Sequence, residues 1–167
     1  MKTFRFSTTA GLGILLLVAP AFGKPWRGIT PLRSTRADVE RLLGAPEPGT
    51  QAVYKSNEDV VRVTYSNVQC DYGWRVPLNT VVSLLIHLKT PPKFTELKID
   101  ERKFEKRRDA GLEYVYHYIS ETEGVNYTVD SVAGVVTAIE YYPMKRDGRL
   151  KCPLKPKPKG RVLLKTP

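Results

Sequence analysis

The stretch of residues 28–46, GITPLRSTRADVERLLGAP, constrains the fold more than any other, because a helix start and a helix stop follow each other within it. Thr35 is a favourable N-cap, and Asp38 stands at the capping-box spacing, so the two side chains satisfy backbone N–H groups that a helix leaves unpaired. Gly44 accommodates the left-handed conformation common after a helix, and Pro46 prevents continuation. The sequence therefore predicts one short helix.

The same helix carries an apolar stripe that needs a surface on which to dock. Val39, Leu42 and Leu43 fall at i, i+3 and i+4, which places them on one face of a helix. The polar residues of the other face are Arg36, Glu40 and Arg41. We expect the stripe, including Leu42, to be buried against the strands that follow.

The rest of the chain predicts an antiparallel sheet, because apolar and polar residues alternate along most of its strands. The expected strands are 52–56, 60–66, 80–89 as the central strand, 113–120, 125–130 and 135–142, with 94–99 as a possible further strand. Asp100 is expected to cap a second short helix over ERKFEKRRDAG that ends at Gly111. The predicted fold is α+β, with about six strands and two short helices, in a possible αβββ-αβββ duplication that no residue identity supports.

The register of one hairpin follows from its turn. A turn over residues 121–124 places Ser120 opposite Val125, which sets Tyr118 opposite Tyr127 on one face. For the last strand the sequence does not decide which residues face the core, because a bulge in the preceding turn would shift the alternation, so either Tyr141 or Tyr142 faces inward.

The opening block also carries a resemblance. Its residues are Trp26-Arg27-Gly28-Ile29, Pro31-Leu32, Ser34-Thr35-Arg36 and Asp38-Val39-Glu40-Arg41-Leu42-Leu43-Gly44-Ala45-Pro46. This block resembles the opening of a group of uncharacterised bacterial secreted proteins, over a length that extends to about Pro153. The helix and the strand meander after it, residues 28–88, are more distantly similar to outer-membrane assembly lipoproteins of the BamE/SmpA type and to β-lactamase-inhibitor-like (BLIP-like) modules. The resemblance implies an envelope binding or scaffolding module, although the lipidated cysteine of those lipoproteins is missing here.

Residues 1–23 have the pattern of a secretory signal. Lys2 and Arg5 precede an apolar run over residues 11–19, and small residues follow at Ala21 and Gly23. We expect cleavage after Gly23, or after Ala21, and a periplasmic or secreted protein without lipid and without a transmembrane segment; a retained signal anchor is the alternative. The predicted domains are the signal (1–23), one α+β domain (24–150) and a basic Pro/Lys-rich tail (151–167).

The net charge of +10 is concentrated outside the predicted domain. Of the 27 Lys and Arg residues, 2 lie in residues 1–23 and 6 in residues 151–167, so the 19 that remain in residues 24–150 meet 17 Asp and Glu, a net of +2. Such a balance does not indicate a nucleic-acid surface. The expected partner is instead an envelope protein or an anionic envelope polymer, the latter attracted by the tail.

Cys70 and Cys152 are the only cysteines of the chain. Because an exported chain meets an oxidising compartment, we expect them to form a disulfide. The sequence does not decide between pairing within one chain and pairing between two chains.

The loop 67–79 is the most plausible binding site, because it combines Tyr72, Trp74 and Arg75, residue types that dominate protein interfaces. Trp74 capping the sheet edge is the structural alternative. A second candidate is the basic cluster Lys103, Lys106, Arg107 and Arg108, which would grip anionic glycans or lipid head groups unless neighbouring acids simply balance it on a solvated face.

Motifs for catalysis, metal binding or a cofactor are absent from the sequence. His87 and His117 stand apart on different predicted strands, so we expect no metal site, no cofactor and no enzyme. The rival interpretation is a small secreted hydrolase or glycan-modifying enzyme that uses His117 with Asp130 or Asp71. A second rival is an inhibitor of a secreted enzyme, which needs a rigidly projecting 67–79 loop.

Overall fold

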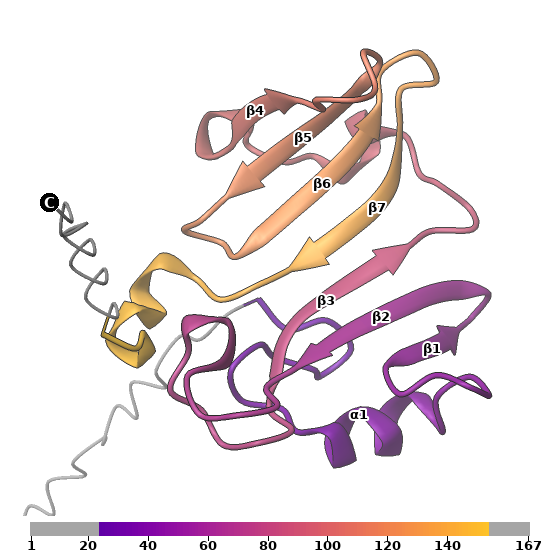
Figure 1. Cartoon of the computed structure of the whole chain (residues 1–167). Coiled ribbons are helices and arrows are strands. Elements are labelled where there is room, and N and C mark those ends of the chain that lie inside the picture. The colour runs from indigo at the N-terminus through magenta and orange to yellow at the C-terminus, as the bar shows by residue number, and fades with distance from the viewer. Residues whose placement is uncertain (1–23, 154–167) are drawn as a thin grey trace, which may run out of the picture.

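The computed structural model describes residues 24–153, so the predicted signal and most of the predicted tail lie outside the described residues. Within these residues the α+β fold is confirmed: one α-helix, α1 (Arg36–Leu43), accompanies a single antiparallel sheet of seven strands (Figure 1). The strands are β1 (Val53–Ser56), β2 (Asp59–Tyr65), β3 (Val81–His87), β4 (Glu105–Arg108), β5 (Val115–Ser120), β6 (Val125–Asp130) and β7 (Val135–Tyr141). Four 3₁₀ segments complete the described part of the chain: η1 (Asp71–Gly73), η2 (Phe94–Leu97), η3 (Glu101–Lys103) and η4 (Lys145–Leu150).

The sheet consists of two meanders that join through their last strands. Its order is β1-β2-β3-β7-β6-β5-β4, so β3 and β7 pair in the middle and β1 and β4 form the edges (Figure 1). Each meander alone is a small sheet, and their pairing provides one continuous surface for a common core. The second meander has four strands, begins with the edge strand β4 and is not directly preceded by an α-helix, so the αβββ unit does not repeat.

The predicted capping of α1 is confirmed, and its predicted buried face is partly wrong. The Thr35 side chain accepts a hydrogen bond from the Asp38 backbone N–H, and Asp38 accepts one from the Thr35 N–H. Val39 is fully buried and Leu43 packs against the core, but Leu42 is 41% exposed. The helix is rotated so that Arg36, predicted on the wet side, lies inward, with its guanidinium carbon 4.1 Å from the centre of the Tyr65 ring.

Residues 94–111 also differ from the prediction. The expected strand 94–99 is the 3₁₀ turn η2, because its apolar residues Phe94 and Leu97 are three apart and reach the core from the same side of such a turn. Asp100 caps only the three residues of η3, and the expected helix continues as strand β4. With Phe104 as its one apolar anchor, a helix here gains less than a strand whose backbone pairs with β5. The longest 3₁₀ segment of the described residues, η4, lies near their C-terminal end instead.

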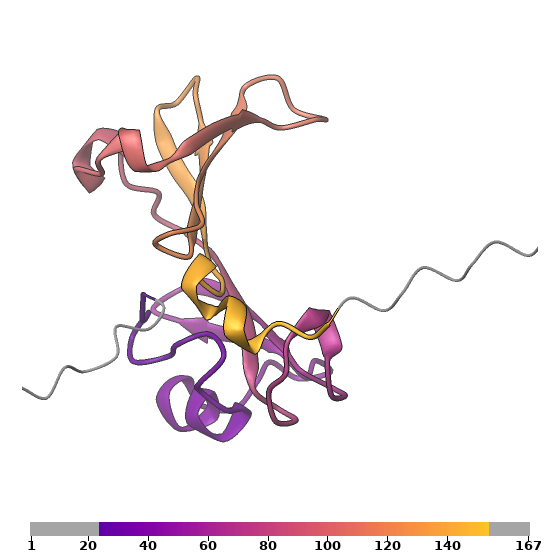
Figure 2. The same ribbon diagram turned by 90° about the vertical axis from the view of Figure 1, so that its left-hand side faces the viewer.

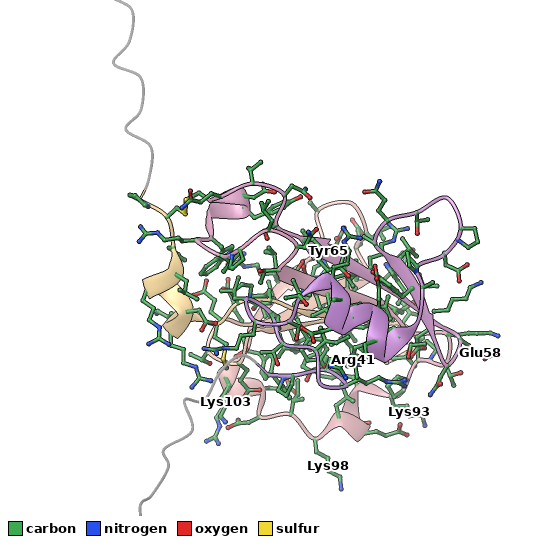
Figure 3. The ribbon with its side chains drawn as sticks, turned by 90° about the horizontal axis from the view of Figure 1, so that it is seen from below. Arg41, Glu58, Tyr65, Lys93, Lys98 and Lys103 are labelled. Atoms are coloured by element: carbon green, nitrogen blue, oxygen red, sulfur yellow. A yellow bond between two sulfur atoms is a disulfide. The ribbon has the colours of Figure 1, made fainter. Side chains whose placement is uncertain are left out.

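The core lies on one face of the sheet. The predicted pairs Ser120 with Val125 and Tyr118 with Tyr127 are confirmed, and of the two tyrosines left open, Tyr141 is the buried one. Figure 2 shows α1 on this side of the sheet. Figure 3 shows α1 from outside the molecule, with Arg41 on the helix and Lys98 extending from the end of η2. The other face carries exposed charged side chains and therefore faces solvent; they are Lys55, Arg62, Glu105 and Arg107.

Candidate functional site

The contact loop, residues 67–79, connects β2 to β3 and has a fixed base. Ser66 ties its two ends together: its Oγ donates to the Pro77 carbonyl at 2.6 Å, and its carbonyl accepts from the Asn79 N–H at 2.9 Å. Inside the loop, the Asp71 carboxylate accepts hydrogen bonds from the backbone N–H groups of Asn67 and Tyr72 at 2.9 and 3.1 Å. These bonds brace the loop, and they occupy the carboxylate of Asp71 within the loop.

The C-terminal segment clamps the contact loop from outside. The predicted Cys70–Cys152 disulfide is present within the chain, with a Cα–Cα distance of 5.7 Å. The Cys152 N–H donates to the Gly73 carbonyl at 2.9 Å, and the Arg75 N–H donates to the Leu150 carbonyl at 2.7 Å. Figure 2 shows the contact loop (magenta) and the end of the described chain (yellow) side by side. Residues 150–152 therefore belong to the folded unit.

The three predicted binding residues do not share one environment. Tyr72 is 59% exposed and Arg75 is exposed, whereas Trp74 is half-buried and has the Lys151 ammonium 5.6 Å from its ring centre. Trp74 thus helps to join the loop to the C-terminal segment, residues 150–152. This is a packing role, similar to the alternative in which Trp74 caps the sheet edge. Tyr72 and Arg75 remain as candidate contact residues.

Two exposed apolar residues of the contact loop were missed by the sequence analysis. Val68 is 61% exposed and Leu78 is 58% exposed, as much as Tyr72. The sequence did hold a sign of this exposure, since both residues lie in the predicted loop, outside the alternating pattern of the strands, and flank its aromatic residues. The loop therefore presents three large apolar side chains to solvent on a braced backbone.

Two hollows adjoin the contact loop. One, of about 360 Å³, is lined by Gln69, Arg75, Val76, Pro77 and Leu78. The other, of about 240 Å³, lies between the loop and α1 and is lined by Arg36, Gln51, Ala52, Val63, Thr64, Tyr65, Asn67 and Tyr72. Tyr72 and Arg75 thus border different hollows, and the loop offers two separate places for a partner side chain.

His117 has other partners than those predicted. Its Nε2 lies 3.1 Å from Asp109 Oδ2, and its Nδ1 lies 3.3 Å from Thr128 Oγ1. This contact with His117, together with hydrogen bonds from two backbone N–H groups, lowers the pKa of the Asp109 carboxyl below its usual value of 3.8. Asp130 instead accepts hydrogen bonds from the backbone N–H groups of Val132 and Ala133, and Asp71 accepts hydrogen bonds within the contact loop. Asp109 was missed because the sequence placed it in a helix, not beside β5.

The basic cluster at β4 is dispersed. The Arg107 guanidinium binds the Glu105 carboxylate with two contacts of 2.7 and 2.8 Å, while Lys106 points to the opposite face and lies 4.4 Å from the centre of the Tyr116 ring. Lys103 pairs with Glu123 at 3.6 Å, and Arg108 donates to a backbone carbonyl. This arrangement matches the solvated alternative, and charged side chains also discourage pairing at an exposed sheet edge.

Within residues 24–153, no three His, Cys, Asp or Glu side chains are grouped closely enough to hold a metal ion. The helices in this part of the chain are all too short or too polar to cross a membrane.

No known family model matches the chain, and comparisons with curated proteins and with solved structures found no match either.

Proposed function

We propose that this chain is an exported binding or scaffold module of the cell envelope, not an enzyme, and that the contact loop is its binding surface. The observation that carries the proposal is the exposure of Val68, Tyr72 and Leu78, each by more than half, on a loop that a disulfide and backbone hydrogen bonds hold in place. Large apolar side chains that are exposed on one loop make that loop a candidate contact site. A braced loop also loses little conformational entropy on binding.

The expected partner is an envelope protein, because the loop presents aliphatic and aromatic side chains that suit a partly apolar protein surface. An inhibitor of a secreted enzyme is a special case of the same proposal, and the braced loop meets its requirement for rigid projection. The tail residues 154–167, with five Lys and Arg and no Asp or Glu, would add attraction to anionic envelope polymers that salt screens.

The test is affinity capture from envelope extract with the full chain and two matched variants. In the first, Val68→Ser, Tyr72→Ser and Leu78→Ser remove the apolar side chains of the contact loop. The control is Val132→Ser, which removes an 84% exposed valine from the β6–β7 turn. A partner that the control retains and the loop variant loses supports the proposal. Retention by both variants contradicts it, and a salt-sensitive loss that follows only deletion of residues 154–167 assigns binding to the tail.

A second candidate function, a small hydrolase, is favoured by one observation. Asp109, His117 and Thr128 form a continuous series of contacts from carboxylate to imidazole to hydroxyl, the order found in acyl-transfer triads, with the two imidazole nitrogens exchanged relative to the Ser-His-Asp arrangement. The test is turnover of p-nitrophenyl acetate by the wild type, Thr128→Val and His117→Gln. Turnover above buffer that both substitutions abolish would favour the hydrolase, and equal rates for all three proteins would exclude Thr128 as a nucleophile for this ester.

A further inference from the structure

The loop hollow, lined by Gln69, Arg75, Val76, Pro77 and Leu78, has an apolar floor and a charged rim. Val76 is buried, Pro77 and Leu78 form an apolar wall, and Gln69 and Arg75 supply the polar groups. Its volume of about 360 Å³ falls at the lower end of the range for pockets that take small organic groups. The hollow is therefore suited to one large apolar side chain with a polar group beside it.

The charge beside the hollow is uncompensated. Among the described residues, the Arg75 guanidinium has no hydrogen-bond or ion-pair partner; only the backbone N–H of Arg75 is bonded, to Leu150. The carboxylate of Asp71, the only acid of the contact loop, is bonded to two backbone N–H groups of the loop. Lys151, on the neighbouring segment, is also exposed, and its ammonium lies 5.6 Å from the centre of the Trp74 ring. An approaching group thus meets an apolar hollow with positive charge at its rim.

We propose that the loop hollow binds a protein segment in which a large apolar side chain stands next to an Asp or Glu. The apolar side chain fills the hollow, and the carboxylate pairs with Arg75, whose planar guanidinium suits two-point contact with a carboxylate. The inference rests on the proposed function and specifies the partner chemistry for that loop.

The charge pattern distinguishes this occupant from two others. The chain's own tail, residues 154–167, contains Val162, Leu163 and Leu164 but no Asp or Glu, so its cations would meet Arg75 and Lys151 unfavourably. A purely anionic polymer would satisfy Arg75 and leave the apolar hollow unfilled. Only a segment with both chemical features matches both parts of the site.

The experiment titrates ¹⁵N-labelled full-length protein with blocked synthetic pentapeptides of the type Ser-X-Phe-X-Ser. With X as Glu, we expect shifts of the Gln69, Val76 and Leu78 amide signals and a Kd on the order of 1 mM, as is usual for a short flexible ligand. Replacing Phe by Ala, or Glu by Lys, should weaken binding about tenfold, because each change removes one of the two contacts.

The variants test Arg75 directly. Arg75→Gln should raise the Kd about tenfold, Arg62→Gln, on the solvent face of β2, should leave it within about twofold, and Arg75→Glu should reverse the preference toward the peptide with X as Lys. Equal binding by wild type and Arg75→Gln, or shifts confined to other regions, would overturn the proposal. Binding that appears only after deletion of residues 154–167 would overturn it in favour of the tail as occupant.

The result also separates this inference from the proposed function. If an envelope partner is lost on substitution of Val68, Tyr72 and Leu78 but is retained by Arg75→Gln, the contact loop stands as the binding surface and the acidic partner segment is refuted. If the loop variant retains the partner, the proposed function itself fails, whatever the pentapeptides show.

Discussion

Removal of the disulfide by Cys70→Ala/Cys152→Ala should greatly reduce stability. The bond joins residues 82 apart in sequence. For a loop of that length, the chain-entropy relation gives about 15 cal/mol/K, or about 4.5 kcal/mol at 25 °C, by which the cross-link disfavours the unfolded chain. This is a large part of the 5–15 kcal/mol typical of a folded domain.

The native state should survive this change. The hydrogen bonds from Cys152 to Gly73 and from Arg75 to Leu150 hold the same two segments together without the sulfur atoms. We therefore expect a folded double variant with a native near-UV spectrum and a lower free energy of unfolding. With a urea m-value of about 2 kcal/mol/M, the midpoint should fall by about 2 M.

The assay is equilibrium urea denaturation, followed by tryptophan fluorescence and circular dichroism in parallel. Cys70→Ser/Cys152→Ser is the control, because it removes the same cross-link but leaves a different side chain in place of each sulfur. Agreement of the two double variants within about 0.5 kcal/mol assigns the loss to the cross-link. An unchanged midpoint, or two free thiols in the oxidised wild type, would refute the reasoning.

Three further predictions concern a turn, the helix and one carboxyl group. Gly124→Ala should destabilise by about 3 kcal/mol or more, because φ is +64° and the new Cβ would lie 2.4 Å from a carbonyl oxygen, whereas Gly134→Ala, with φ +67° and open space, should cost only about 1–2 kcal/mol in urea denaturation; equal losses would contradict the clash. Val39→Ala should cost about 2 kcal/mol and Leu42→Ala about 1 kcal/mol or less in the same assay, and the reverse order would contradict the helix orientation. Because the native pKa of Asp109 is lowered, its contribution is present above pH 3.8 and is lost as the pH falls through the lower native pKa, so Asp109→Asn should flatten the acid limb of a plot of thermal midpoint against pH; an unchanged limb would contradict the Asp109–His117 contact.

Features that depend on neighbours in sequence could be predicted. The Thr35–Asp38 cap involves residues three apart, and the register of the β5–β6 hairpin follows from its four-residue turn. A disulfide of Cys70 and Cys152 was expected from composition, since no other thiol competes, but only the structure places it within one chain. In each case the possible partners were few or close along the chain, so local chemistry decided the outcome.

The candidate site was predicted in part for the same reason. Residue types pointed to the loop 67–79 and to Tyr72 and Arg75, but the bracing role of Trp74 depends on Lys151, which is remote in sequence. The sequence indicates only that Val68 and Leu78 lie in a loop beside aromatic residues, and their degree of exposure depends on which side of the loop faces the C-terminal segment.

Only the tertiary structure decided which faces are buried and which charged groups meet. The rotation of α1 that exposes Leu42 and places Arg36 on Tyr65 depends on the surface formed by β1 and β2, because an eight-residue helix is oriented by its contacts more than by its own stripe. Likewise, residues 105–108 form a strand because the edge of β5 offers backbone partners, and this pairing brings Asp109 to His117. Sequence patterns describe preferences over a few residues, whereas burial and ion pairing depend on surfaces assembled from distant segments.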